Sequence, residues 1–478
     1  MKLRPSFPEI PADNPFANCK LEREPFAKIL TSVIDCAEGG FTMALNGSWG
    51  TGKTTFVRMW QKYLEKAGYK TAYINAWEMD FTTNPLVSIL GEVGSLTGKD
   101  RKAFKKIIKA LPKSVRLGAE GFISTYTGQG AIKNLFNRHQ SFDDDIASYC
   151  DQKEALQQFR SELQNFIEVN CGGKPLVFFI DELDRCRPDY AVEFLERIKH
   201  FFCVDNIIFI ISVDKRHLAE SVKGHYGSAD IDTDEYLRRF FDVEYELPTP
   251  EIKAFCEYIF KRENLDGVQT DKEKDILLDI ILMLVQSENI TLRQVERYIS
   301  QLKLCYASYR ELLVWHDLAA FLIFHKYFNP EIYDNLKASR YDVNSLSKLL
   351  SDKYGSWLRK EAHKGPYKMS YLVINLLYRY NKQLGIDGIP YLGDYRRLDK
   401  LPVLNFESHK VEQAYAYNLI RDLEKINDGI ALSDLYHLID ISLPFTKDDL
   451  TPRLQSNRYG LHPLCQRGNG TVPAVVYA

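Results

Sequence analysis

The sequence predicts an α/β fold, in which a parallel β-sheet is flanked by helices and followed by an all-α C-terminal region. Two observations predict the sheet. A glycine-rich pattern lies between an apolar run and a helix, and a second apolar run ends in two acidic residues. Runs that are apolar throughout are typical of parallel strands covered on both faces. From about residue 250 onward, apolar residues recur at helical spacing, which predicts the helical region.

The first predicted strand, Phe41 to Leu45, leads into a glycine-rich loop and then into a helix from Thr55 to Gln61. The loop fits the pattern G-x-x-x-x-G-K-[ST], and a strand before it and a helix after it are the setting that this pattern needs. Glycines let several backbone N–H groups turn toward one phosphate, and the helix N-terminus adds about half a positive charge there. The alternative is a glycine-rich turn that fits the pattern by chance.

We therefore predict the parallel sheet of a P-loop NTPase, with a nucleoside-triphosphate site on this loop. Lys53 is placed to reach the β- and γ-phosphates, and the Thr54 hydroxyl is placed to bind Mg²⁺. The residues predicted to bind the nucleotide here are Gly47, Ser48, Trp49, Gly50, Thr51, Gly52, Lys53, Thr54 and Thr55.

A second strand is predicted from Thr71 to Trp77, and a third, from Leu176 to Ile180, ends in Asp181 and Glu182. At the carboxyl end of a buried strand, Asp181 is placed to hold Mg²⁺ beside Thr54. Glu182 is placed to orient or deprotonate the attacking water. The alternative is a plain helix N-cap, because acidic residues favour the first turn of a helix.

A further apolar strand, Ile207 to Ile211, is followed by Ser212 and Asp214. Period-two geometry puts these two residues on one face of the strand, so one of them is a candidate to contact the γ-phosphate or the water. Asp214 fits equally well as a cap on the helix that follows. The sequence leaves both interpretations open.

Composition and charge restrict the class of protein. The chain has 478 residues and a formal net charge of −2, so no global basic field argues for nucleic acid. Its nine cysteines include no C-x-x-C pair, which indicates a reducing compartment and neither a disulfide framework nor a zinc site. The sequence has no signal peptide and no apolar run of about 18 residues. We expect a soluble, cytoplasmic protein.

Five short sequences together resemble the KAP family of P-loop NTPases, within the AAA+/STAND-like ASCE group. The match extends from about residue 12 to 305, and we recognise nothing after Tyr306. The five are LEREPFA (21–27), NAWE (75–78), DELDRCRP (181–188), YLRRFFD (236–242) and TLRQVERY (291–298).

The resemblance implies that the nucleotide is ATP. It also implies that Arg238 or Arg239 is an arginine finger that reaches the γ-phosphate of a neighbouring subunit in a homo-oligomer. Arg293 would be a sensor arginine from a helical lid. A guanidinium at the transferring phosphoryl group can be worth roughly 10³–10⁵ in rate. The alternative for these arginines is a surface position, and Asp184 and Arg185 are expected to form a pair that positions the loop.

One departure from the family concerns residues 95–170, where many members carry transmembrane helices and this chain does not. Its 99–116 stretch is instead basic, with apolar residues on one side of a helix as far as Pro112. Such a helix can lie on an anionic membrane surface or contact nucleic-acid phosphates, but docking of its apolar side on the protein is favoured. The basic residues are Lys99, Arg101, Lys102, Lys105, Lys106, Lys109, Lys113 and Arg116.

Three domains are expected. Residues 1–250 would form the P-loop NTPase domain with a helical insertion at about 95–170, residues 251–330 a lid-like helical domain, and residues 331–478 an α-helical domain with a flexible tail. Aromatic residues next to cations in the last domain suit base stacking, although tyrosine is also common at packed interfaces. They are Tyr367, Tyr371, Tyr378, Tyr380, Tyr391 and Tyr395, near Arg379, Arg396 and Arg397.

We therefore expect an ATPase that binds and hydrolyses Mg²⁺-ATP and acts as a conformational switch in an oligomer. Its catalytic residues would be Glu182, Lys53 and Arg238 or Arg239. The resemblance further implies bacterial anti-phage defence, beside a separate effector protein. Two alternatives stay open: an ATP-binding scaffold without significant turnover, and a nucleic-acid-stimulated ATPase.

Overall fold

A computed structural model describes ten stretches of the chain: residues 8–81, 84–96, 101–112, 142–249, 251–263, 271–288, 290–308, 316–361, 368–385 and 431–442. The chain divides into two compact units, Met1–Lys303 and Leu304–Ala478. The three-domain division expected from the sequence, with boundaries after residues 250 and 330, stays a prediction. The expected C-terminal tail lies outside the described residues.

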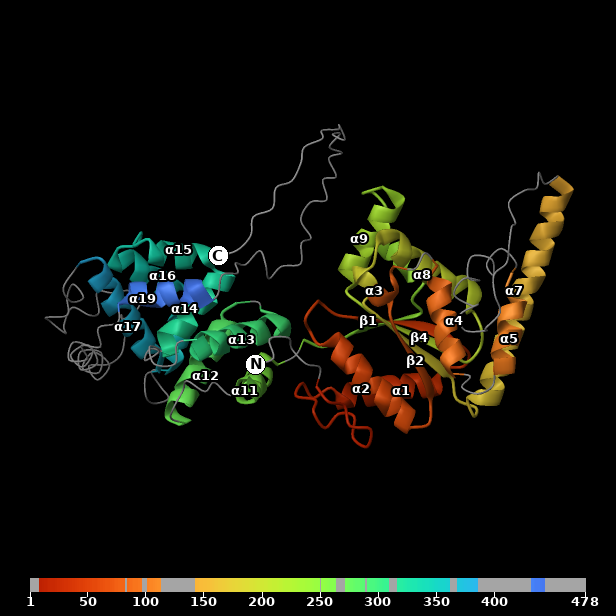
Figure 1. The fold of residues 1–478 in the computed structure, drawn as a ribbon, viewed down its shortest axis with the longest axis horizontal. Helices are drawn as coiled ribbons and strands as arrows, with labels where there is room; N and C mark the ends of the chain where they lie inside the picture. Colours follow the sequence, from red (N-terminus) through yellow and green to blue (C-terminus); the bar gives the residue numbers. More distant parts are fainter. Residues whose placement is uncertain are drawn as a thin grey trace, which may run out of the picture. The chain divides into compact units, whose positions relative to one another are not determined.

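Five strands form one sheet in the first unit (Figure 1). Every neighbouring pair of strands is parallel, so the predicted α/β fold with a parallel sheet is confirmed. In space the order is β2 (Lys70–Asn75), β3 (Leu176–Asp181), β4 (Ile207–Val213), β1 (Phe41–Asn46) and β5 (Val243–Glu246).

Helices cover both faces of this sheet. α1 and α2 pack on one face, and α4, α5, α7, α8 and α9 contribute to the core on the other. Of the short elements, α3 follows β2, η1 follows β3 and α10 follows α9. The bounds are α1 (Glu24–Cys36), α2 (Lys53–Lys66), α3 (Ala76–Met79), α4 (Pro85–Leu96), α5 (Arg101–Ala110), α7 (Phe142–Asn170), η1 (Leu183–Arg185), α8 (Pro188–Phe201), α9 (Lys215–Tyr226) and α10 (Thr233–Arg238).

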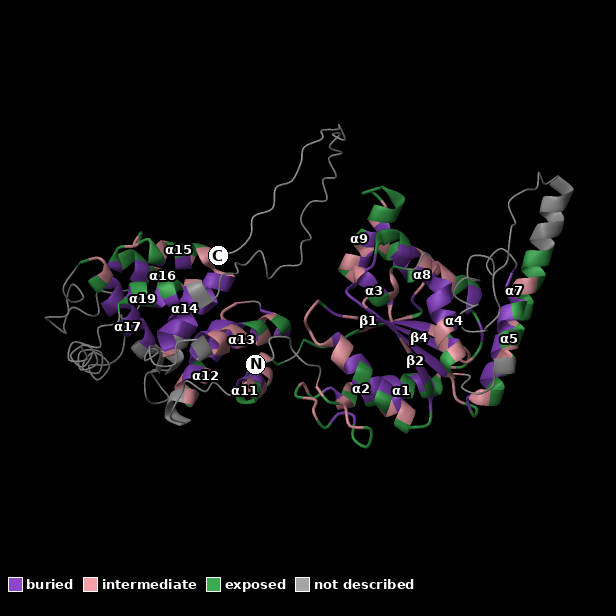
Figure 2. Ribbon diagram, in the orientation of Figure 1, coloured by how far each residue is buried: buried purple, intermediate pink, exposed green. Residues whose placement is uncertain are grey.

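Apolar side chains of the central strands alternate between the two faces. Val177 and Phe179 of β3 point to the core with α1 and α2, whereas Phe178 and Ile180 point to the opposite core. β3 and β4 are buried at every position (Figure 2). Both faces of these strands therefore select apolar residues, which explains why their sequences show no polar alternation.

Polar residues meet where the strands end. The parallel register places Asn75 of β2 opposite Asp181 of β3, and Asp181 opposite Ser212 of β4. The sequence predicts that the second strand continues to Trp77, but in the structure it ends two residues earlier, at Asn75. The Asn75 side chain accepts hydrogen bonds from the backbone N–H groups of Trp77 (3.1 Å) and Glu78 (3.3 Å) and so caps α3.

The basic helix docks its apolar side, as favoured from the sequence. Phe104, Ile107 and Ile108 of α5 are buried in the core shared with α4 and α7, and Lys105 and Lys109 are exposed. Lys99, Lys113 and Arg116 of the predicted stretch lie outside the described residues. Within the described parts of the chain, no helix combines the length and apolar character needed to cross a membrane.

Three helices follow β5 in the first unit: α11 (Ile252–Glu263), α12 (Asp271–Gln286) and α13 (Leu292–Ser308, whose last residues belong to the second unit). A capping box starts α13, because Thr291 and Gln294 satisfy each other's backbone N–H groups. The Gln294 side chain accepts from the Thr291 backbone at 2.9 Å, and the Thr291 hydroxyl accepts from the Gln294 backbone at 3.4 Å. This cap fixes where α13 begins.

The second unit is helical where it is described. Its central helix, α14, is buried from Asp317 to Tyr327, which explains an almost uniformly apolar sequence. Tyr378, Arg379 and Tyr380 of the stacking hypothesis are buried in the interior, and no side chain is described for the other residues of that hypothesis. The bounds are α14 (His316–Phe328), α15 (Pro330–Lys337), α16 (Val343–Glu361), α17 (Lys368–Gln383) and α19 (Leu432–Ser442).

Asp317 in this unit gives a prediction about stability. Burial raises the pKa of its carboxyl from the usual 3.8 to about 6. A raised folded-state pKa contributes stability that is present below pH 4 and is lost as the pH rises through 6. Asp317→Asn removes the ionisation, so we expect it to raise the free energy of unfolding by about 2 kcal/mol at pH 8. Urea unfolding followed by circular dichroism measures this.

The control for this prediction is to repeat the comparison of variant and wild type at pH 4.5. Burial also lowers the pKa of His325 to about 3, so acid destabilises the unit through His325 in wild type and variant alike. The difference between the two proteins therefore isolates Asp317. We expect it to shrink at pH 4.5, and an equal stabilisation at both pH values would contradict the prediction.

Candidate functional site

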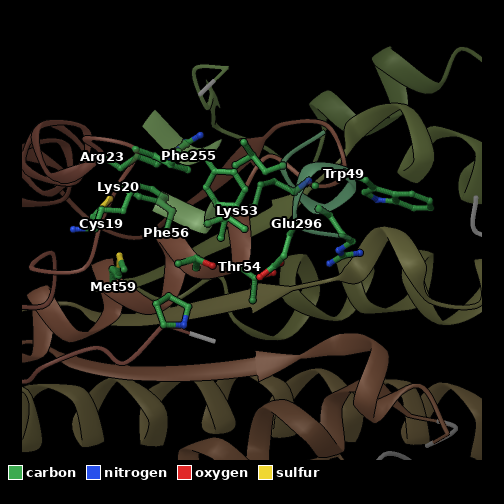
Figure 3. Close-up of a pocket in the computed structure, with 18 of the residues that line it drawn as sticks. Cys19, Lys20, Arg23, Trp49, Lys53, Thr54, Phe56, Met59, Phe255 and Glu296 are labelled. Atoms are coloured by element: carbon green, nitrogen blue, oxygen red, sulfur yellow. The ribbon is translucent and has the colours of Figure 1, made fainter. Parts of the chain in front are cut away.

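Residues from five segments line one cavity of about 400 Å³ in the first unit. The segments are the stretch before α1, the phosphate loop with α2, the turn after β3, and helices α11 and α13. Trp49 lies at one end, Cys19 and Arg23 at the other, and Lys53 and Thr54 between them (Figure 3). The sequence-predicted residues that line the cavity are Trp49, Gly50, Gly52, Lys53, Thr54, Thr55, Asp181, Glu182 and Arg293.

The loop between β1 and α2 turns on two glycines in left-handed conformations. Gly50 has φ +80° and Gly52 has φ +86°, values that other residues rarely adopt. Gly50 also touches the start of α13, because a Cβ atom on it would lie 2.8 Å from the Thr291 Cβ. The glycine at position 50 thus allows both the loop conformation and the close approach of the lid-like helices.

Lys53, the first residue of α2, is buried and points back over the loop. Its ammonium group donates to the Gly47 carbonyl and, at 3.2 Å, to the Ser48 carbonyl, while Thr51 Oγ1 donates to the Ser48 carbonyl at 2.8 Å. Burial lowers the pKa of the Lys53 ammonium group. Asp184, Asp214 and Asp181 offset part of this effect, and a phosphate entering the loop would add negative charge directly against the buried cation.

Thr54 and Asp181 line the same cavity, Thr54 from the first turn of α2 and Asp181 from the end of β3. Asp181 Oδ2 accepts from the Tyr73 hydroxyl at 3.1 Å, and Oδ1 accepts from the Glu182 backbone at 3.0 Å. One hydroxyl and one oriented carboxylate fit Mg²⁺, which takes few protein oxygens and keeps waters and substrate phosphates as its other ligands.

Glu182 follows β3 with φ +60°, a left-handed conformation that is uncommon for a side-chain-bearing residue. Its carboxylate forms an ion pair with Arg185 (2.9 Å) and accepts from the Asn75 amide at 3.4 Å. Burial raises the pKa of the Glu182 carboxyl, and the nearby Arg185 partly offsets this effect. The backbone conformation aims a partly buried carboxylate into the cavity, where it can accept a proton.

Asp184 connects the phosphate loop to the sheet. Its Oδ2 accepts from the Trp49 indole N–H and, at 3.0 Å, from the Asp214 backbone. The Trp49 ring also stacks on His217 at 3.8 Å between centroids. Asp184 therefore holds the loop, as expected, but Arg185 pairs with Glu182 and not with Asp184, because η1 turns the two side chains to different neighbours.

The structure separates the two candidates at the end of β4. Asp214 caps α9, since its carboxylate accepts from the Arg216 backbone at 3.2 Å. Ser212 is completely buried beside Asp181, and within the described residues its hydroxyl has no hydrogen-bond partner. Asp214 therefore has the capping role. Ser212 lies at the carboxyl end of β4, next to Asp181, with a hydroxyl that has no hydrogen-bond partner among the described residues.

The predicted arginines take two different positions. Arg293 stands in the first turn of α13, lines the cavity, and its electrostatic neighbours include Glu182 and Arg185. Burial is the main cause that lowers the pKa of the Arg293 guanidinium. Arg238 and Arg239 lie at the exposed end of α10, outside the residues that line this cavity.

Arg23 was missed by the sequence analysis as a site residue. It is 2% exposed and donates to the carbonyls of Thr51 in the loop (3.1 Å) and Pro248 before α11 (3.0 Å). Burial lowers the pKa of its guanidinium to about 10. It belongs to the LEREPFA sequence, but no local pattern signals a partner 225 positions away.

Comparison with known protein families identifies one family for this chain. A model of the KAP family P-loop domain matches residues 23–309. No curated protein matches the chain. Similar solved structures include a DNA replication initiation factor, at 12% identity and TM-score 0.31 over 93% of this chain and 99% of that one.

Two further structures are similar at the same level. DnaA from Aquifex aeolicus bound to AMPPCP has 13% identity and TM-score 0.26 over 89% of this chain and 93% of its own. ORC2 from Aeropyrum pernix has 16% identity and TM-score 0.30 over 88% and 94%.

Proposed function

Because the chain belongs to the KAP family of P-loop NTPases, we propose that it binds and hydrolyses Mg²⁺-ATP as a conformational switch in a homo-oligomer. The observation that carries this proposal is that Lys53, Thr54, Asp181 and Glu182 line one cavity. These residue types supply phosphate binding, metal binding and a base for water in phosphoryl transfer.

The residues have distinct roles in the proposed reaction. The loop amides and Lys53 hold the phosphates, and Thr54 and Asp181 hold Mg²⁺, which neutralises phosphate charge when bound. Glu182 accepts a proton from water as the water oxygen forms a bond to the γ-phosphorus and the bond to the ADP oxygen breaks. The products are ADP and inorganic phosphate. Arg293 contacts the nucleotide from α13.

The oligomer is supported by the position of the arginine pair. Arg238 and Arg239 are exposed at the C-terminal end of α10 and lie outside the cavity of their own chain. Arg238 pairs with the exposed Glu235 at 3.5 Å, a surface ion pair that is weak enough to exchange for a phosphate of a neighbouring copy. A role in bacterial anti-phage defence, beside a separate effector protein, is supported by the family's link to phage and plasmid exclusion.

A mixing experiment tests the shared site. Glu182→Gln lacks the base and Arg239→Ala lacks the finger, so each variant alone should be inactive. In a mixed oligomer, some sites combine an intact Glu182 with an intact Arg239, and we expect partial recovery of ATPase activity. Wild-type specific activity should also rise with protein concentration, because assembly completes the site.

The matched control is Arg197→Ala, which removes a partly exposed arginine of α8 that pairs with Glu193 and lies outside the residues that line the cavity. It should behave as wild type in every mixture. If Arg239→Ala keeps full activity and wild-type specific activity is independent of concentration, the site is complete in one subunit. If the wild type binds ATP without turnover, alone or with DNA, the protein is an ATP-binding scaffold instead.

A further inference from the structure

We propose that Arg185 is a catalytic arginine supplied by the same subunit, which leaves Glu182 and binds the γ-phosphate when a nucleoside triphosphate enters the cavity. This inference rests on the proposed function, because it names a residue that recognises the γ-phosphate of that substrate. It adds an arginine within the subunit to the finger expected from a neighbour.

The first observation is where Arg185 lies. It is the last residue of η1, directly after the acidic pair, and it lines the same cavity as Lys53 and Arg293. It is an electrostatic neighbour of both of these cations. These three cationic side chains therefore line the cavity that contains the phosphate loop, and Arg185 is the one that pairs with the predicted base.

The second observation is how Arg185 is held. Its guanidinium carbon lies 5.7 Å from the centroid of the Trp49 ring and 5.8 Å from that of Trp77. Trp49 belongs to the phosphate loop itself, so this contact keeps the cation beside the loop. Cation–π contacts hold a guanidinium through its charge and leave its N–H donors available.

The third observation is what Arg185 binds in this structure. Its Nη1 lies 2.9 Å from Glu182 Oε1, and the side chains are 22% and 13% exposed. While this ion pair persists, Glu182 shares its charge with a cation and is a weaker acceptor for a proton from water. The cavity thus contains a base whose charge is already neutralised.

A γ-phosphate offers Arg185 a better partner. Phosphate oxygens carry more charge than one carboxylate and match the planar guanidinium in a bidentate manner. When Arg185 moves to them, Glu182 keeps its contact with Asn75 and regains its capacity to accept the proton. A diphosphate has no γ-phosphate, so it leaves the Arg185–Glu182 pair in place.

The test compares ATP with ADP binding by isothermal titration calorimetry, in the presence of Mg²⁺, for wild type and Arg185→Gln. We expect the Kd for ATP to rise about tenfold or more and the Kd for ADP to stay within about twofold, because a charged hydrogen bond to the γ-phosphate is lost. In turnover assays, kcat should fall at least about a hundredfold. Arg197→Gln is the matched control: it changes a half-buried arginine of α8 that pairs with Glu193 and lies outside the residues that line the cavity, so it should leave both Kd values unchanged.

A double-mutant cycle tests the exchange itself. Glu182→Gln frees Arg185 from its ion pair, so it should bind ATP more tightly than wild type does. The same substitution in an Arg185→Gln background should bring no such gain. Thermal unfolding without nucleotide shows whether each variant is folded. Arg185→Lys keeps the charge but not the planar guanidinium, so its Kd for ATP should lie between those of wild type and Arg185→Gln.

Three results would overturn the inference. Arg185→Gln could weaken ATP and ADP equally, which would make Arg185 a residue that only supports the loop. It could hydrolyse ATP as fast as wild type, or faster, which would make the ion pair a purely inhibitory contact. The Glu182→Gln gain could also persist without Arg185. If wild type binds ATP but never hydrolyses it, the proposed ATPase function fails, whereas the ATP-to-ADP comparison still decides the role of Arg185.

Discussion

Lys53→Met is expected to weaken ATP binding by at least about a hundredfold, because it removes a buried ammonium group that we predict to contact the β- and γ-phosphates. Charged hydrogen bonds of this kind are worth roughly 1.5–3 kcal/mol each, so the loss of two of them exceeds the roughly 2.7 kcal/mol that a hundredfold change requires. Methionine keeps the length and apolar stem of the side chain, so packing on α2 should persist. Calorimetric titration with ATP measures the effect.

Lys62→Met is the matched control for this prediction. Lys62 belongs to the same helix, is exposed, and pairs with Glu65 at 2.7 Å. It should bind ATP as wild type does, since it lies outside the residues that line the cavity. If Lys53→Met binds ATP within threefold of this control, the loop is a glycine-rich turn without the predicted function.

Glu182→Gln is expected to lower kcat by about 10²–10⁴ while ATP binding is retained, because glutamine is isosteric but cannot accept a proton from water. The pH profile adds a second readout. Burial raises the pKa of Glu182, so its charged form is lost at a higher pH than for an ordinary glutamate. As the pH is lowered, wild-type kcat should therefore begin to fall at a higher pH than the pKa of an ordinary glutamate would give.

The control for Glu182→Gln is Glu193→Gln, which removes a partly exposed carboxylate of α8 that pairs with Arg197. It should keep both kcat and the acid limb of the pH profile. If Glu182→Gln hydrolyses ATP at the wild-type rate, another group activates the water, and the proposed role of Glu182 is wrong.

The sheet and the loop could be predicted because their signals are local. Continuous apolar runs mark β3 and β4, and the loop pattern needs only the strand before it and the helix after it. The family resemblance, carried by five short sequences, is confirmed by the match over residues 23–309. The roles assigned to the individual site residues remain predictions.

The contacts that could not be predicted join residues far apart in the sequence. Arg23 reaches Pro248, and Gly50 meets Thr291, through the tertiary arrangement of α11–α13. The Arg185–Glu182 pair was missed for a different reason. The sequence places several charged residues close to Arg185, and it does not show which of them Arg185 contacts. The turn of η1 brings the Arg185 side chain to Glu182, three positions earlier.

The attachment of helices α11–α13 to the sheet has a mechanical consequence. The chain leaves β5 at Leu247, whose N–H donates to the Asn46 carbonyl at 2.8 Å, and Arg23 holds the next carbonyl. Asn46 immediately precedes the phosphate loop, so any rotation of these helices about this attachment would be centred beside that loop. A 17-residue helix such as α13 is about 25 Å long, so a rotation of about 10° about this attachment displaces its far end by about 4 Å. A small rotation at the phosphate loop would therefore be amplified along α13.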